Sequence, residues 1–119
     1  MFESILSSLV SQVDGAQGAI FLDDDGEAIV WYTTGDPNEL RLRAAYAAVL
    51  VKTSRSLAAR LGNGNLTSLL VEYENSQFLI KSLARSYFIA LELDRSANLA
   101  QAFIQIGPVA DLLSREITR

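Results

Sequence analysis

The side chains best suited to bind a metal ion form one acidic run, Asp23-Asp24-Asp25-Gly26-Glu27. Carboxylate oxygens are the ligands that calcium prefers, but a calcium loop spreads them over about twelve residues so that the backbone wraps around the ion. Here the carboxylates follow one another directly, around an Asp-Asp-Gly sequence that is typical of a hairpin turn. We therefore expect a turn between two strands and no metal site.

The side chains on which most enzymes depend are missing. The chain contains no cysteine and no histidine, which excludes disulfides, thiolate nucleophiles, the usual general base and the commonest zinc ligands. No S-x-x-K or G-x-S-x-G pattern places a nucleophile beside a base. The run Gly62-Asn63-Gly64-Asn65 is rich in glycine, but it lacks the preceding strand, following helix and lysine of a phosphate-binding loop. We predict a non-enzymatic protein with no catalytic residue and no cofactor.

Length and composition indicate one ordered domain over residues 1–119. Half of the residues are hydrophobic and a fifth are charged, which excludes disorder. No apolar run approaches the roughly twenty residues that span a membrane, and the first residues lack the basic start of a signal peptide. We expect a cytoplasmic protein without membrane insertion. The net charge of -4 argues against a nucleic-acid partner.

The charges are unevenly distributed along the chain. Residues 1–40 contain no lysine or arginine, whereas five basic residues lie between positions 37 and 61: Arg41, Arg43, Lys52, Arg55 and Arg60. One interpretation is a solvated helix face that complements an acidic neighbourhood; the other is a surface for an acidic protein partner. The sequence leaves both open.

Residues 37–61 are predicted to form one long helix around which the other elements are arranged. Asp36 is a suitable N-cap, Pro37 occupies the first helical position, and Gly62 stands where a terminating glycine belongs. At 100° per residue, one apolar stripe should lie on a sheet, and three larger side chains widen it. The stripe is Leu40, Ala44, Ala47, Ala48, Val51, Ala58 and Leu61, widened by Tyr46, Leu50 and Leu57.

The far side of this helix is also apolar, at Leu42, Ala45 and Val49. A helix that covers a sheet in a monomer would leave these side chains in water. The alanines and serines of the helix allow close approach of a second backbone, so a second copy of the helix is the expected cover.

The remaining elements are predicted from the spacing of the apolar residues and from the residues typical of turns. Residues 2–13 have the spacing of an amphipathic helix, and the last helix begins at Asp94 or Ser96. Pro108 should kink that helix or break it in two. Asn98 is either a helix cap or a partner contact, and Trp31 is either at the core edge or on a contact surface. Strands are expected at 18–23, 27–33, 66–74, 77–82 and 87–93.

These elements predict an α/β/α sandwich of the α+β type. Consecutive strands that pair as hairpins give one five-stranded antiparallel sheet of order 2-1-5-4-3, with the long helix on one face and the terminal helices on the other. The third strand then forms a sheet edge. That edge contains Leu69, Val71 and Tyr73, which would pair with a second copy of the chain. In the last helix the predicted buried face is Leu99, Ala102, Phe103, Ile106, Val109, Ala110, Leu113 and Ile117.

The sequence resembles the Roadblock/LC7 domain family over nearly its whole length. The element order agrees, as do four local patterns: Asp14-Gly15-Ala16-Gln17-Gly18-Ala19, Asp23-Asp24-Asp25-Gly26, the alanine-rich helix ending at Gly62, and Ala97-Asn98-Leu99. Ala100 and Pro108 depart from the usual pattern. The resemblance implies a profilin-like fold and a homodimer with edge-to-edge sheets and antiparallel long helices.

The resemblance also implies a function: binding of a small Ras-like GTPase, with or without an effect on hydrolysis. We assign the partner-binding surface to Arg41, Leu42, Val49 and Lys52, and the dimer interface to Leu42, Ala45, Val49, Leu69, Val71 and Tyr73. Two alternatives remain: a small-molecule sensor or scaffold without a GTPase, or an enzyme that uses carboxylates alone. The sensor predicts a sizeable pocket with convergent polar groups, and the enzyme a perturbed carboxylate in a cleft.

Overall fold

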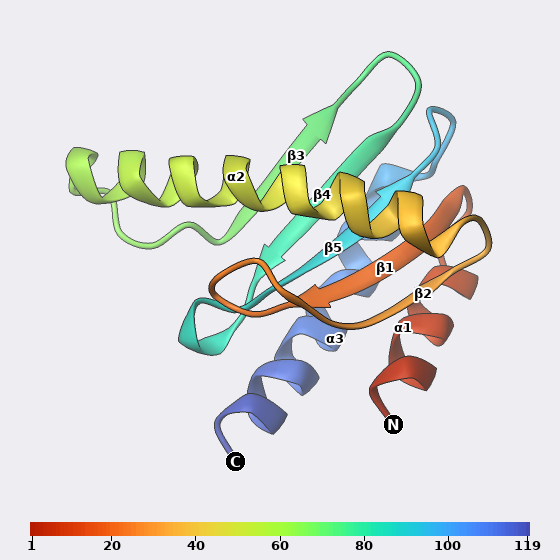
Figure 1. The fold of residues 1–119 in the computed structure, drawn as a ribbon, viewed down its shortest axis with the longest axis horizontal. Coiled ribbons are helices and arrows are strands. Elements are labelled where there is room, and N and C mark those ends of the chain that lie inside the picture. Colours follow the sequence, from red (N-terminus) through yellow and green to blue (C-terminus); the bar gives the residue numbers. More distant parts are fainter.

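A computed structural model describes residues 1–119, and its element order is the predicted one (Figure 1). The helices are α1 (Phe2–Ser11), α2 (Pro37–Leu61) and α3 (Leu99–Ile117), with a short 3-10 turn, η1 (Ala84–Ser86). The strands are β1 (Ala16–Leu22), β2 (Ala28–Thr33), β3 (Ser68–Glu72), β4 (Gln77–Ser82) and β5 (Phe88–Leu93). None of the helices combines the length and hydropathy needed to cross a membrane.

The five strands form one antiparallel sheet of order β2-β1-β5-β4-β3, as the sequence predicts. Figure 1 shows α2 crossing one face of this sheet, while α1 and α3 lie side by side against the other. The α/β/α sandwich is therefore confirmed. β2 and β3 are its two edge strands.

Each face of the sheet has its own hydrophobic core. In β1, Ile20 and Leu22 point toward α2, whereas Ala19 and Phe21 point toward α1 and α3. This explains why the strand is apolar at successive positions: both of its faces are covered by helices. Trp31 packs at the margin of the core under α2, which confirms the core-edge interpretation.

The predicted bounds of α2 are confirmed. The Asp36 carboxylate accepts a hydrogen bond from the backbone N–H of Asn38 at 2.9 Å, and Gly62 ends the helix with φ of 63°. The sheet-facing stripe buries Leu40, Ala44, Ala47, Ala48 and Val51. Leu61 was wrongly placed in this stripe: it is 74% exposed, because the last turns of α2 project beyond the sheet (Figure 1).

The last helix differs from the prediction in two ways, and one of the two effects predicted for Pro108 is excluded. It begins at Leu99, since Asn98 is the N-cap and accepts from the N–H of Gln101 at 3.0 Å. Pro108 does not break it, and its exposed ring lies within one continuous helix. Phe103 was wrongly assigned to the buried face, because 46% of it is exposed.

β3 is shorter than predicted and is partly buried on both faces. Leu69 packs against the core under α2, while Leu70 packs against the core of α1 and α3. Residues on both faces of this edge strand therefore contribute to the two cores. Tyr73 lies just beyond the strand and is 51% exposed.

Candidate partner-binding surface

The outer side of α2 carries two large apolar side chains that no other element of the chain covers. Leu42 is 58% exposed and Val49 is 60% exposed. They are seven residues apart, which places them two turns apart on one side of the helix. We call Leu42 and Val49 the crest of α2. Ala45 is also exposed, so all three far-side residues named from the sequence face solvent.

A second apolar row lies on the side of α2 that faces β3. Tyr46, Leu50 and Leu57 are 67%, 37% and 54% exposed, and we call these three residues the β3 flank. Their predicted position over the sheet is wrong. They remain uncovered because β3 is the last strand and is only five residues long. The strand order already made β3 an edge, so this signal was available in the sequence.

The β3 flank and the β3 strand enclose an apolar groove. A cavity of about 310 Å³ lies between Tyr46 and Leu50 on α2 and Val71 and Tyr73 at β3. The outer edge of β3 borders the same groove, since no strand follows it in the sheet. An open sheet edge beside exposed apolar side chains is a typical site of strand pairing with another chain. Three predicted interface residues, Leu69, Val71 and Tyr73, thus adjoin the flank rather than the crest.

The two basic residues predicted to bind a partner lie on the opposite side of α2. The Arg41 guanidinium stands over the Trp31 ring, 4.6 Å from its centre, in a cation–π contact. Lys52 Nζ donates a hydrogen bond to the backbone carbonyl of Asp25 at 3.0 Å. Both side chains are therefore held beside the β1–β2 hairpin. The structure places Arg41 and Lys52 along one border of the crest.

A buried carboxylate fixes the first half of α2 on the sheet. Glu92 lies on β5 beneath the helix with its side chain only 4% exposed, and its Oε2 is 2.7 Å from Nε of Arg43. Arg43 Nη1 also reaches Glu39 at 3.2 Å. The sequence analysis did not identify this pair. Glu92 was the available signal, because it is the one charged residue in an otherwise apolar strand.

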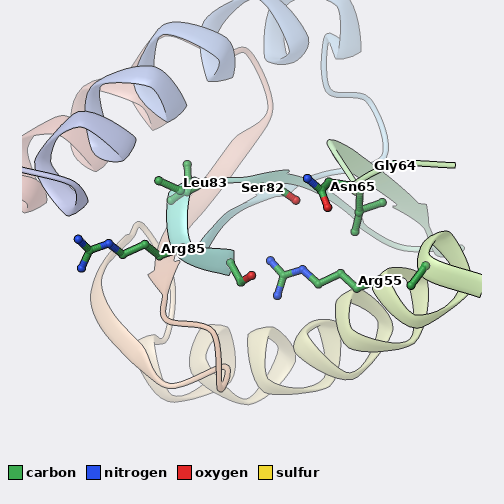
Figure 2. Close-up of a pocket in the computed structure, with 10 residues that line it drawn as sticks. Arg55, Gly64, Asn65, Ser82, Leu83 and Arg85 are labelled. Atoms are coloured by element: carbon green, nitrogen blue, oxygen red, sulfur yellow. The ribbon is translucent and has the colours of Figure 1, made fainter. Parts of the chain in front are cut away.

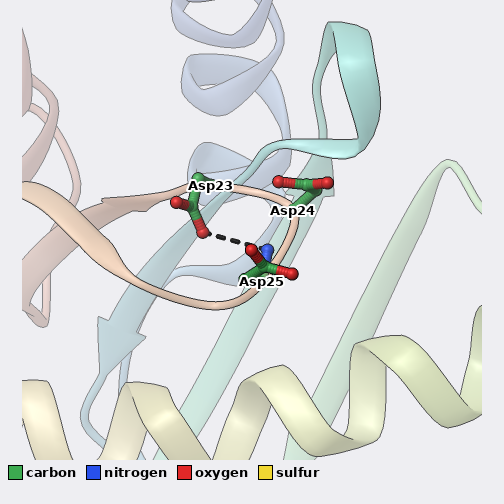
Figure 3. Close-up of side chains that lie close together, drawn as sticks. All are labelled: Asp23, Asp24 and Asp25. Carbon is green, nitrogen blue, oxygen red and sulfur yellow. Dashed lines mark hydrogen bonds between the residues drawn. The ribbon is translucent and has the colours of Figure 1, made fainter.

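The acidic run lies in the β1–β2 turn and has a structural role there. The Asp23 carboxylate accepts a hydrogen bond from the backbone N–H of Asp25 at 2.9 Å (Figure 3) and a second from that of Glu27, also at 2.9 Å. Asp24 and Asp25 point into solvent. The three carboxylates have oxygens within 4.8 Å of one another. One of the three is thus already engaged in closing the turn.

The sequence patterns around residues 14 and 98 meet at one junction. The Asn98 N–H donates to the Asp14 carbonyl at 3.1 Å, and the Asp94 N–H donates to the Gly15 carbonyl at 2.9 Å. Gly15 has φ of +88°, and a Cβ there would lie 2.6 Å from the Cα of Ala97. Only glycine fits this position. Asn98 therefore caps α3 and joins it to β1, which confirms the capping role.

A comparison with known families identifies this arrangement. The Roadblock/LC7 domain pattern matches residues 3–92, about three quarters of the chain. The chain belongs to the Roadblock/LC7 family. Its members are generally non-catalytic regulatory and adaptor domains. No curated protein matches the chain in the sequence search.

Solved structures of Roadblock/LC7 proteins have the same fold. A Roadblock/LC7 domain from Streptomyces avermitilis is 21% identical, with a TM-score of 0.89 and coverage of 98% of both chains. MglB from Myxococcus xanthus is 14% identical with a TM-score of 0.87, over 98% of this chain and 94% of that one. An MglB structure described as having a tetrameric arrangement is 19% identical with a TM-score of 0.85, over 96% and 85% of the two chains. At these identities the similarity establishes the fold.

Proposed function

We propose that this Roadblock/LC7 chain is a cytoplasmic, non-catalytic homodimeric adaptor that binds a small Ras-like GTPase. The observation that carries the proposal is the continuous apolar surface made by the β3 flank, the groove and the free edge of β3. A stable monomer gains nothing from exposing such a surface, and a second copy would cover it. Family membership and the tetrameric arrangement of one related MglB support self-association.

In the proposed dimer, the two β3 strands pair in antiparallel fashion and the two α2 helices lie side by side through their β3 flanks. Leu69, Val71 and Tyr73 belong to this interface, and Tyr46, Leu50 and Leu57 extend it. Ala45 lies on the other side of the crest, near Arg41 in a shallow depression with Asn38 and Gly26. We therefore move Ala45 from the proposed dimer interface to the partner-binding surface, and we assign Leu42 and Val49 to the partner-binding surface alone.

The crest is the proposed centre of the GTPase-binding surface. Side-by-side α2 helices would present Leu42 and Val49 from both copies on one platform, with Arg41 and Lys52 along its borders. An apolar centre with a polar, charged rim is the usual anatomy of a protein interface. The basic rim also favours an acidic region of the partner over a basic one.

Leu57→Glu tests the dimer. It would place a charge in an apolar seam, so we expect the dimer dissociation constant in sedimentation equilibrium to rise at least about a hundredfold. Leu57 is already 54% exposed in the single chain, so the variant should fold normally by circular dichroism. Val49→Glu is the matched control: it adds the same charge to the crest and should leave the dimer intact. A Leu57→Glu protein that remains as dimeric as Val49→Glu would exclude the proposed seam.

Val49→Glu in turn tests the platform. Purified protein would be titrated with each Ras-like GTPase of the same genome, in the GTP-analogue and GDP states, by calorimetry. We expect one GTPase to bind, and Val49→Glu to weaken that binding by at least about tenfold while the dimer persists. Absence of binding to every GTPase in both states would refute the proposed function and leave the dimer untouched.

A further inference from the structure

A polar cavity of about 520 Å³ lies at the end of the sheet farthest from the Gly15 junction (Figure 2). Three separate segments line it: the C-terminal half of α2 with Arg55, the loop between α2 and β3 with Asn65, and the end of β4 with the connection to β5, which contribute Ser82 and Ser86. A volume of roughly 300 to 1,000 Å³ is typical of small-molecule sites. The cavity is therefore large enough for more than a single ion.

Hydrogen-bond donors converge on this cavity. Figure 2 shows the Arg55 side chain extending from α2 toward the β4–β5 connection, with Ser82 and Asn65 on the neighbouring wall. The hydroxyl oxygen of Ser82 has no hydrogen-bond partner, but it is buried in the wall and does not open into the cavity. Arg85 also lines the cavity, but its guanidinium is directed away from Arg55 in this view. No carboxylate side chain is among the lining residues.

Arg55 is a partly desolvated cation without an ion-pair partner. None of the three salt bridges of the chain involves it. Its one hydrogen bond, to the carbonyl of Tyr87, is long at 3.5 Å, and its guanidinium rests over the Phe88 ring. Burial lowers the pKa of Arg55, and the charge of nearby Asp24 partly opposes this effect. The guanidinium is thus held in place with most of its donors free.

We propose that this cavity binds the phosphate group of a small molecule. A guanidinium fork matches phosphate geometry, and charge-assisted hydrogen bonds of this kind are about twice as strong as neutral ones. Phosphate has more acceptor oxygens than a planar carboxylate, so it can also use the hydroxyl of Ser86 and the amide of Asn65. The remaining volume would hold the group that carries the phosphate.

The proposed site is independent of the dimer and of the GTPase. At 100° per residue, Arg55 lies about 160° around α2 from Leu57 of the β3 flank. It also lies some 120° from Val49 of the crest. A failure of the phosphate proposal would therefore leave the proposed function standing, and the reverse also holds. A bound small molecule would agree with the sensor alternative raised by the sequence.

The test is a titration of the full-length, ¹⁵N-labelled chain with inorganic phosphate at constant ionic strength, followed by amide chemical shifts. We expect saturable shifts confined to Asn65, Ser82, Ser86 and their neighbours. Arg55→Gln should raise the dissociation constant at least about tenfold. The matched control Arg60→Gln, on the same helix and exposed, should change it by less than about twofold. Shifts that do not saturate, or an equal effect of Arg60→Gln, would overturn the site.

Ser86→Ala separates binding from folding. Because Ser86 is exposed and lines the cavity, removal of its hydroxyl should change the urea midpoint little, while phosphate binds more weakly. A lower midpoint with unchanged phosphate affinity would contradict the assigned role. Ribose 5-phosphate should bind at least as tightly as inorganic phosphate, and acetate more weakly than either. Acetate binding as tight as phosphate, or a phosphate ester that binds more weakly than the free ion, would refute the proposed ligand class.

Discussion

Arg43→Met should destabilise the fold strongly, because it leaves the buried Glu92 carboxylate without its ion-pair partner. The Glu92 side chain is only 4% exposed, and the 2.7 Å contact with Arg43 Nε is its one ion pair. Removal of one member of a buried pair typically costs about 3 to 5 kcal/mol. Methionine keeps most of the apolar stem of Arg43, so little of this cost comes from lost packing. For a domain of this size, about 3 kcal/mol corresponds to a decrease in Tm of roughly 10 °C.

The opposite substitution should cost much less. In Glu92→Gln the remaining charge is on Arg43, whose side chain is 44% exposed, can be hydrated and keeps its ion pair with Glu39. The glutamine can still accept a hydrogen bond from Arg43, so we expect a loss of about 1 kcal/mol. The double variant Arg43→Met/Glu92→Met replaces the pair by apolar groups of similar volume. It should be more stable than Arg43→Met alone.

The assay is urea unfolding followed by circular dichroism at one fixed protomer concentration, because dimerisation would couple apparent stability to concentration. Arg41→Met is the control, since Arg41 is exposed on the same helix and loses only a cation–π contact of about 0.5 to 1 kcal/mol. If Arg43→Met were no more destabilising than Glu92→Gln, the carboxylate would not depend on this arginine for its burial. The asymmetry between the two variants is thus the decisive result.

The remaining predictions concern turns and caps, each measured by urea unfolding. Gly15→Ala should cost at least about 2 kcal/mol from backbone strain and overlap with Ala97, whereas Gly62→Ala, also at positive φ but in open space, should cost only about 1 kcal/mol. Asn98→Ala removes the N-cap of α3 and should cost about 1 kcal/mol. Asp23→Ala breaks the two hydrogen bonds that close the β1–β2 turn and should cost about 1 to 2 kcal/mol, while Asp24→Ala should change stability by less than about 0.5 kcal/mol. Equal effects within either matched pair would contradict these roles.

The sequence predicted the parts of the fold that local chemistry determines. The bounds of α2 followed from Asp36, Pro37 and Gly62, because caps act within a few residues of the helix end. The strand order followed from hairpin pairing and from a β1 strand too apolar to face water on either side. The start of α3 was less certain, since Asp94, Ser96 and Asn98 are all possible caps and only the junction with β1 selects Asn98.

The candidate sites were harder to predict because they depend on distances between elements. Helical period alone gave Tyr46, Leu50 and Leu57 a place above the sheet. The predicted strand order made β3 the edge beneath them, but how far the sheet covers the helix depends on the length of β3 in the fold. The phosphate cavity combines Arg55 and Ser82, which are 27 positions apart in the sequence and belong to no motif. Pairings of this kind have no periodic signal in one sequence.

The patterns by which the sequence resembles its family explain the fold and not the choice of partner. Gly15 and Asn98 join α3 to β1, and Asp23 closes the β1–β2 turn. Gly26 lies close to Ala48, because a Cβ on Gly26 would be only 2.8 Å from the Cβ of Ala48. A small residue is therefore needed at both positions. None of these residues lies on the crest or the β3 flank. A substitution at Val49 or Leu57 could therefore change what the protein binds without changing its fold. Family membership alone does not identify the partner, because the choice of partner depends on those exposed positions.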